Sequence, residues 1–177
     1  KLGITRERVR QLEANALKQL RKTQKNQEFD FIMEKVFEVM DKYGGLILEG
    51  VLAESIFPKI STINENKLMF VLSCDSRLIH NRSTLKNKSF WSLKKGLKKD
   101  EINKVNKLIF DYLNKNKKSI KIKEALKVIL ESEFKNDFVE KNAEDKLKMF
   151  LLISKDLKRN LLSEWGIKNW RSVSERG

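Results

Sequence analysis

Residues 65–81, ENKLMFVLSCDSRLIHN, and residues 144–160, EDKLKMFLLISKDLKRN, are two versions of one pattern. Each opens with acidic or amide side chains, continues as an apolar helical segment and ends in a polar segment typical of a strand. Such self-similarity indicates an internal duplication in which each copy forms one small structural unit. We therefore expect these two stretches to organise the rest of the chain.

The segments around the two stretches are also alike. Residues 29–42 and 100–116 predict amphipathic helices. Their expected inward side chains are Phe31, Ile32, Val36, Val39 and Met40 in the first, and Ile102, Val105, Leu108, Ile109 and Leu113 in the second. Each helix is followed by a short extended piece and a further helix, within residues 46–57 and 120–134.

Two short strands close each copy, the first pair around a polar tip at residues 80–88. We expect Trp91 and Trp165 to fill the two cores, and helical periodicity places Phe70, Phe150, Met69 and Met149 in the core as well. Leu52 with Leu126 and Phe70 with Phe150 are expected to be equivalent positions. The order helix, strand, helix, helix, two-stranded wing is that of a winged helix-turn-helix. The predicted fold class is mainly α with short β wings, as tandem winged helix-turn-helix domains.

The charge is distributed unevenly along the chain, whose formal net charge is +14. Residues 1–25 hold eight Lys and Arg against two Glu, a net +6, and residues 84–123 hold thirteen against three acidic residues, a net +10. Residues 26–83, with six against nine, carry a net −3. Two basic blocks around an acidic one indicate separate anion-facing surfaces. Lysine-rich composition of an AT-rich genome explains the same excess without a polyanion partner.

The first basic block contains a helix with one polar and one apolar side. Thr5 can cap it, and it is expected to run to about Arg21. The expected buried stripe is Val9, Leu12, Ala16 and Leu20. Arginine, glutamine and glutamate side chains on a helix can bond guanine, adenine and cytosine edges in the major groove. The helix is therefore a candidate DNA reader, and a solvated basic helix is the alternative.

Residues 2–21, LGITRERVRQLEANALKQLR, resemble the end of region four of bacterial RNA polymerase sigma factors. There the turn and recognition helix read very nearly Leu-Gly-x-Thr-Arg-Glu-Arg-Val-Arg-Gln-Ile-Glu-x-x-Ala-Leu-x-x-Leu-Arg. The resemblance implies reading of the upstream promoter element. The implied base readers are Arg6, Glu7 and Gln11, and the implied phosphate or capping positions are Thr5, Arg8, Arg10 and Lys18. The preceding helix of that family's motif is absent from the matched residues, so we expect a partial helix-turn-helix.

The arrangement as a whole resembles bacterial proteins in which sigma region four is followed by winged-helix modules and a HARE-HTH domain. The terminal residues 165–177 are similar to the lead-in to that last domain. The predicted organisation is a partial helix-turn-helix at 1–22, a linker at 23–27, winged-helix unit one at 28–96, winged-helix unit two at 97–168 and a tail at 169–177.

The second basic block is a possible DNA-backbone patch. Its predicted members are Lys86 and Lys88 in the first wing and Lys94, Lys95, Lys98 and Lys99 in the joint between the units. The recognition-helix positions of the winged units are less convincing, because neither helix has a cluster of Arg, Gln and Asn at its N-terminus. The candidates there are Asn66, Lys67, Ser73 and Arg77 in the first copy, and Lys146, Lys148, Lys155 and Lys158 in the second.

Several function classes have no support in the residues. One His and one Cys, His80 and Cys74, cannot form a zinc site, and a single Cys excludes an internal disulfide. We expect Cys74 to be buried, His80 to lie at the surface, and no cofactor, metal, membrane span or catalytic site to be present.

The sequence favours a cytoplasmic, DNA-binding transcription protein that binds double-stranded promoter DNA and acts with bacterial RNA polymerase. Two alternatives remain open. One is a protein-interaction scaffold of degenerate winged helices that binds polymerase or another DNA-bound protein. The other is the DNA-targeting part of a restriction or defence system.

Overall fold

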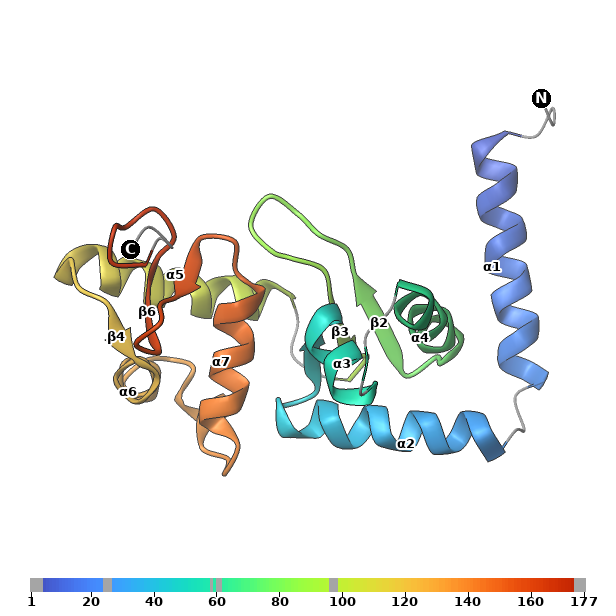
Figure 1. The fold of residues 1–177 in the computed structure, drawn as a ribbon, viewed down its shortest axis with the longest axis horizontal. Helices are drawn as coiled ribbons and strands as arrows, with labels where there is room; N and C mark the ends of the chain where they lie inside the picture. Colours follow the sequence, from blue (N-terminus) through green and yellow to red (C-terminus); the bar gives the residue numbers. More distant parts are fainter. Residues whose placement is uncertain (1–4, 24–26, 58, 60–61, 96–98, 174–177) are drawn as a thin grey trace.

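The computed structural model describes residues 5–23, 27–57, 59, 62–95 and 99–173. Helix α1 (Arg6–Thr23) stands at one end of an elongated molecule, and two similar units follow it (Figure 1). Unit one comprises α2 (Gln27–Lys42), β1 (Leu46–Leu48), α3 (Glu49–Ile56), α4 (Thr62–Cys74), β2 (Leu78–Asn81) and β3 (Phe90–Leu93). Unit two comprises α5 (Lys99–Asn116), β4 (Ile120–Lys121), α6 (Ile122–Leu130), the 3-10 helix η1 (Lys135–Phe138), α7 (Ala143–Ile153), β5 (Leu157–Arg159) and β6 (Glu164–Ile167).

Each unit contains a three-stranded antiparallel sheet whose last strand lies in the centre. The strand orders are β1-β3-β2 and β4-β6-β5. Trp91 pairs with Ile47 on one side and His80 on the other, while Trp165 pairs with Ile120 and Arg159. The predicted mainly helical fold with short β segments is confirmed at this level.

The two units match residue by residue once their strand registers are aligned. Val36 and Ile109, 73 positions apart, are both fully buried, and Leu68 and Leu147, 79 positions apart, are both buried. Unit two therefore has six additional residues before α7. The register makes Ala125, rather than the expected Leu126, the equivalent of Leu52.

The same alignment corrects a second expected pair. The stretches at 65–81 and 144–160 align without a gap, so Phe70 corresponds to Met149, and Phe150 corresponds to Val71. Phe70 is 56% exposed, whereas Phe150 is fully buried. The expectation that Phe70 belongs to the core was wrong.

Helix α2 buries a narrower stripe than its sequence suggests. Met33, Val36 and Met40, spaced by three and four residues, are buried. Phe31, two residues before Met33, lies on another face and is 57% exposed, and Ile32 is also exposed. The expectation that Phe31 and Ile32 point inward was wrong. Phe31 lies on the side opposite the buried stripe, and Ile32, four residues before Val36, lies at the edge of the stripe, where it lines a groove with residues of α4.

The cores of the two units are closed by tryptophans, as expected. Trp91 and Trp165 are each buried in the central strand of their sheet, and Cys74 is buried at the end of α4.

The turns that follow α2 and α5 each contain a residue with a left-handed backbone, Gly44 at φ 71° and Lys117 at φ 52°. Glycine takes this conformation without strain, whereas lysine does so at a cost.

The units share one apolar core and are held together by a loop. The loop between β2 and β3, residues 82–89, reaches across to the segment after α7 (Figure 1). There Asn87 and Ser154 form an isolated antiparallel bridge, and the Lys88 amide donates to the Ile153 carbonyl at 2.8 Å. The buried apolar residues of both units form one continuous cluster. This arrangement fixes unit one against unit two.

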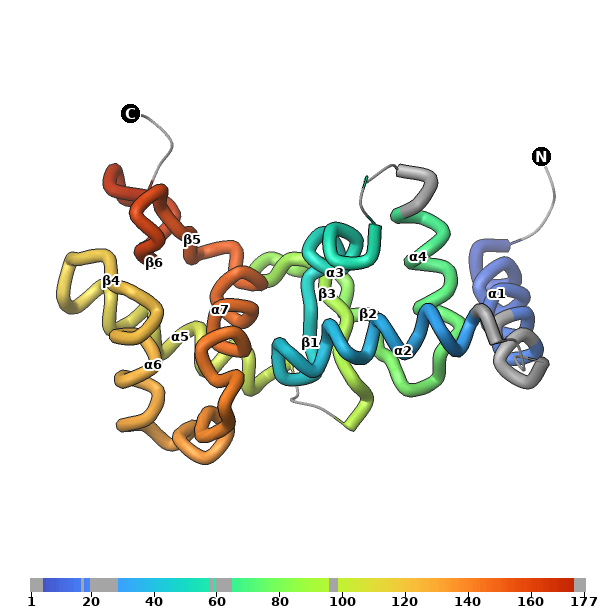
Figure 2. The backbone as a smooth tube through the Cα atoms, turned by 60° about the horizontal axis from the view of Figure 1, so that its bottom comes forward, coloured from blue at the N-terminus to red at the C-terminus, as the bar shows by residue number. Residues whose placement is uncertain are grey.

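The other contacts between the units come from α7 and the segment before it. Strand β1 lies against α7, and the Leu48 amide lies 3.4 Å from the Met149 sulfur (Figure 2). The Asn142 side-chain amide donates to the Asp41 carbonyl at 2.8 Å. Met149 is buried by this packing, whereas its equivalent, Phe70, is exposed. Helix α1 lies beside α4, but in the described part of the chain it leaves Phe70 uncovered.

Among the described residues, no helix has the length and apolar character needed to cross a lipid bilayer.

Candidate nucleic-acid interface

Helix α1 begins as its sequence predicts. The Arg8 amide donates to the Thr5 hydroxyl at 3.2 Å, and the Val9 amide donates to the Thr5 carbonyl at 3.1 Å. A hydroxyl cap of this kind stabilises a helix by about 1 kcal/mol. Glu7 in the first turn adds a favourable interaction with the helix dipole. Thr5 therefore has a structural role at the start of α1.

Three of the expected DNA-contacting side chains form one exposed cluster around Glu7. Arg10 Nε lies 3.2 Å from Glu7 Oε2, and the Gln11 side-chain amide donates to Glu7 Oε1 at 3.4 Å. An exposed ion pair of this kind is worth about 0–1 kcal/mol, so it can open when a ligand competes. Arg6, Arg8 and Lys18 are exposed on the same helix.

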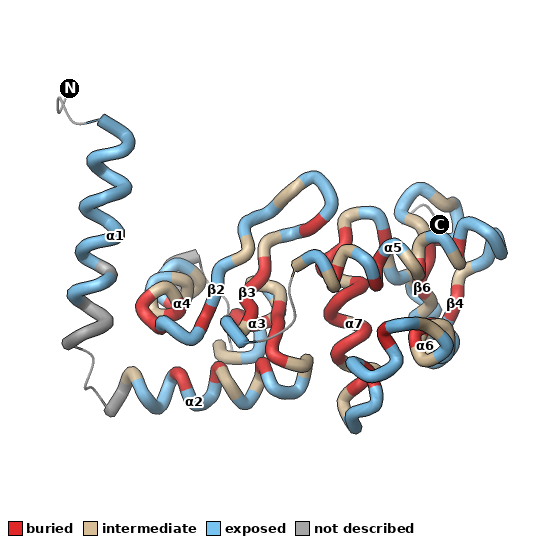
Figure 3. The backbone as a smooth tube through the Cα atoms, turned by 180° about the vertical axis from the view of Figure 1, so that it is seen from behind, coloured by how far each residue is buried: buried red, intermediate tan, exposed pale blue. Residues whose placement is uncertain are grey.

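The expected buried stripe of α1 is not buried. Val9 and Leu12 are 46% and 47% exposed, and Ala16 is exposed as well; the side chain of Leu20 lies outside the described residues. The helix projects from the body of the molecule and lies beside α4 (Figure 3). The stripe is exposed because the first turns of α1 extend beyond the elements that could cover it.

The family model for sigma-70, region 4, matches residues 1–22. No curated protein and no solved structure shows a significant match to the chain. The match covers the described part of α1 up to Lys22 and the residues before it, so it relates this helix to sigma region four. It does not extend to either of the two units.

Beyond this sigma-like helix, the predicted lysine patch is divided between two places. Lys86 and Lys88 lie in the loop at 82–89, before β3, and Lys94 and Lys95 lie in the turn after β3. Six residues of extended chain span up to about 20 Å. Lys99 begins α5, and Lys98 lies outside the described residues. The lysines therefore form clusters at the two ends of β3.

The first cluster lies against unit two. The Lys86 carbonyl accepts from the Lys155 amide at 2.8 Å, and the Lys155 ammonium donates to the Thr84 carbonyl at 2.7 Å. Partial burial lowers the pKa of Lys88, and the positive charge of Lys168 lowers it further. Main-chain groups at the tip of the loop are therefore hydrogen-bonded to unit two, while the side chains of Lys86 and Lys88 are exposed.

Two of the weaker recognition-helix candidates stabilise the fold. Arg77 pairs with the buried Asp75 through two nitrogen atoms, with an Nη2 to Oδ2 distance of 2.6 Å, and this hydrogen bond raises the pKa of Arg77. Lys146 is buried, and its ammonium donates to the Asp137 carbonyl at 2.6 Å. Lys146 is therefore buried away from any surface that DNA could contact, whereas the Arg77 side chain stays largely exposed while it pairs with Asp75.

The outer face of α4 is apolar where a DNA-reading helix would be polar. Phe70 and Val71 line a shallow groove there, together with Ile32 and Phe57. This surface was not predicted from the sequence, because helical periodicity alone assigned Phe70 to the core. An exposed apolar groove of this kind is typical of protein-binding surfaces.

Proposed function

We propose that the protein is a DNA-binding transcription protein related to sigma factors, and that α1 reads promoter DNA. The observation that carries the proposal is the sigma-70 region 4 match on a helix whose polar side chains are exposed. Arg6, Glu7 and Gln11 lie within its first two turns, which is the part of a recognition helix that enters the major groove. Arg8, Arg10 and Lys18 are assigned to phosphates.

The proposal includes two winged helix-turn-helix modules. Its support is the order helix, strand, helix, helix, strand, strand in both units, with the last strand central in each sheet. In this assignment α4 and α7 occupy the recognition-helix position, and the loops at 82–89 and 160–163 are the wings. Bacterial RNA polymerase is the proposed protein partner, and the cytoplasm is the proposed location.

The test is a titration of the chain with labelled duplexes, one selected from a random pool and one scrambled. Gln11→Ala should reduce discrimination between the two duplexes about 5- to 150-fold, which corresponds to roughly 1–3 kcal/mol for one base contact. Arg10→Ala should weaken both complexes alike and reduce the salt dependence. Lys135→Ala, an exposed lysine in η1, is the control and should change neither quantity.

Equal losses for both duplexes with Gln11→Ala would show that α1 grips the backbone and does not read bases. Charge reversal of Lys94 and Lys95 tests the second contact separately. It should lower affinity for both duplexes, and unchanged affinity would remove this turn from the interface.

A second candidate function is a protein-interaction scaffold. Two observations favour it: the apolar groove on α4, and the first wing, whose tip is bound to unit two. In this case Phe70→Ser would abolish polymerase binding while DNA affinity stayed unchanged. Pull-down of purified core polymerase by the two variants Phe70→Ser and Gln11→Ala separates the candidates.

A further inference from the structure

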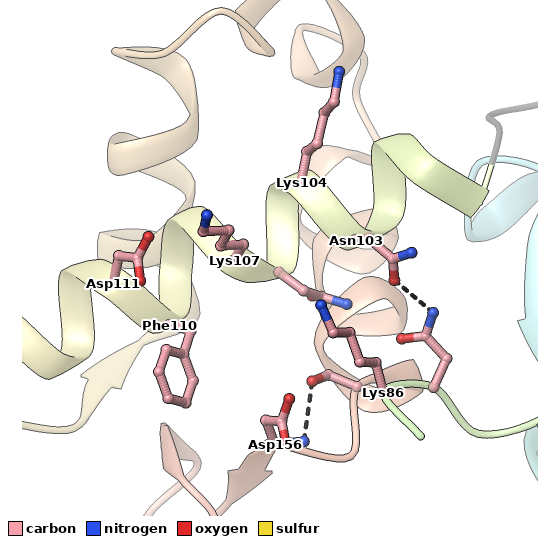
Figure 4. A pocket seen from close by; sticks show the side chains of 10 residues that line it. Lys86, Asn103, Lys104, Lys107, Phe110, Asp111 and Asp156 are labelled. Carbon is pink, nitrogen blue, oxygen red and sulfur yellow. Dashed lines mark hydrogen bonds between the residues drawn. The ribbon is translucent and has the colours of Figure 1, made fainter. Parts of the chain in front are cut away.

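A cavity of about 370 Å³ opens on unit two, between α5 and the turn that follows α7 (Figure 4). Phe110 from α5 and Asp156 from the turn lie on the same side of the helix, and a second cavity meets the first at these two residues. Lys86 of the loop at 82–89 lies at one edge. The cavity thus combines an aromatic ring, a carboxylate and a contribution from unit one.

The equivalent place in unit one is filled by the chain itself. Phe37 is the counterpart of Phe110, and the Arg77 guanidinium lies over its ring, 4.2 Å from the centroid. Asp75 holds that guanidinium through hydrogen bonds from Nε at 3.0 Å and from Nη2 at 2.6 Å. A planar cation is therefore stacked on phenylalanine and paired with a carboxylate.

Matching hydrogen bonds establish that the two places are equivalent. The Arg77 amide donates to Asp75 Oδ1, and the Asp156 amide donates to the Ser154 hydroxyl, in each case across two residues. The Arg77 carbonyl accepts from the Lys94 amide, and the Asp156 carbonyl accepts from the Lys168 amide. Asp156 thus occupies the position of Arg77, and Ser154 that of Asp75.

In unit two the guanidinium is missing and only the ring is kept: Ser154 stands in place of Asp75, and Asp156 supplies a carboxylate from the position of Arg77. The Asp156 carboxylate makes no hydrogen bond or ion pair with another described residue. Asn106 lines the cavity at 7% exposure, and its Oδ1 has no hydrogen-bond partner, while its amide nitrogen donates to the Phe150 carbonyl. A buried acceptor without a donor is costly, so a ligand with N–H groups would be favoured here.

We propose that this cavity binds an arginine side chain of a partner protein. The guanidinium stacks on Phe110, pairs with Asp156 and donates to Asn106 Oδ1. Its five planar donors suit this combination of ring and acceptors, whereas an ammonium cannot stack and pair in the same way. The proposal is independent of whether α1 reads DNA.

The charges at the rim of the cavity determine which residues can flank that arginine in the partner protein. Lys104 and Lys107 line the cavity from α5, and Figure 4 shows Lys104 extending away from Phe110. Together with Lys86 they set three ammonium groups against the one carboxylate of Asp111 at the rim, so the rim repels a uniformly basic segment and attracts carboxylates. The expected partner segment therefore carries an arginine flanked by acidic side chains.

The experiment titrates the chain with a capped Gly-Glu-Arg-Glu-Gly peptide. Isothermal titration calorimetry measures the affinity, and the NMR signals of the Phe110 ring report binding at the cavity. In one control peptide citrulline replaces arginine, which keeps the planar shape of the side-chain end and removes its charge. In a second, lysine replaces arginine, which keeps the charge and removes the planar group. Arginine should bind at least about tenfold more tightly than either, a difference of about 1.4 kcal/mol. Asp156→Asn should remove that preference. Equal affinity for the arginine and citrulline peptides, or no binding up to about 10 mM, would overturn the proposal.

A second variant tests the cavity without removing a core side chain. The double substitution Ser154→Asp with Asp156→Arg rebuilds in unit two the pair that unit one contains. It should fold, keep or raise the melting temperature and lose peptide binding, because its own guanidinium covers Phe110. A folded double variant that still binds the peptide would contradict the assignment. Guanosine monophosphate is the competing probe: if it shifts the Phe110 signals and the peptide does not, the cavity is a nucleotide site and the proposal fails.

Discussion

The contact between Asn87 and Asn103 should couple the stabilities of the two units. Asn87 is buried in the loop at 82–89, and its amide donates to Asn103 Oδ1 on α5 at 2.6 Å. A neutral hydrogen bond contributes a net of about 1 kcal/mol to folding. Asn87→Ala removes the donor and leaves a half-exposed acceptor that water can reach, so we expect a loss of about 1–2 kcal/mol.

The reverse substitution should cost more. Asn103→Ala leaves the buried Asn87 amide without an acceptor, and an unsatisfied buried donor costs about 1–3 kcal/mol. The double variant should lose less than the sum of the two single variants, with a coupling free energy of about 1 kcal/mol. Additive losses would show that the bond does not contribute.

The assay is urea unfolding, followed by far-UV circular dichroism and by the indole NMR signals of Trp91 and Trp165. Each tryptophan is buried in one unit, so each reports on its own core. Because the two cores are continuous, both signals should disappear at the same urea concentration in the unsubstituted chain. Separate midpoints for Trp91 and Trp165 would refute the reasoning that the units form one cooperative body.

Three further outcomes follow from single side chains. Trp165→Ala should lower stability by about 3–5 kcal/mol, because it empties the core of unit two, and a thermal melt against Trp165→Phe measures this. A hydrogen bond from Ser119, and a weaker effect of one from Asn160, lower the pKa of Glu164, so this carboxylate stabilises the fold when it is ionised. Its contribution is lost as the pH falls through the lowered pKa. Glu164→Gln should therefore flatten the acid side of a plot of melting temperature against pH, and an unchanged plot would exclude this role. Thr5→Ala should destabilise the start of α1 by about 1 kcal/mol and lower its amide protection in hydrogen exchange, whereas Thr5→Ser should not.

Parts of the structure were predictable because they depend on local chemistry. The Thr5 cap requires only a hydroxyl before a helical run. Trp91 and Trp165 were predicted as core residues because a large aromatic side chain in the last strand of a small unit can bury its surface only against the helices of that unit. The repeated stretches at 65–81 and 144–160 indicated two similar units, each with a short sheet.

Other parts depend on neighbours that periodicity cannot identify. Phe70 and Met149 occupy equivalent positions, yet only Met149 is covered, because unit one packs on it. The cavity at Phe110 was encoded in the sequence, since the gapless alignment sets Asp156 against Arg77. The cavity could not be predicted from that alignment alone, because the sequence does not show that Arg77 covers Phe37 in unit one.

The two copies differ in length at the places where they meet. The first copy has eight residues between its closing strands, 82–89, and the second has four, 160–163; the extra residues make the bridge to unit two. The second copy has twelve residues before α7, 131–142, and the first has five, 57–61; this longer segment ends at Asn142, which binds Asp41 of unit one. Each insertion therefore contacts the neighbouring copy, and the joint between the halves depends on both of them. Neither half could now be replaced by a second version of the other without losing the joint that both insertions build.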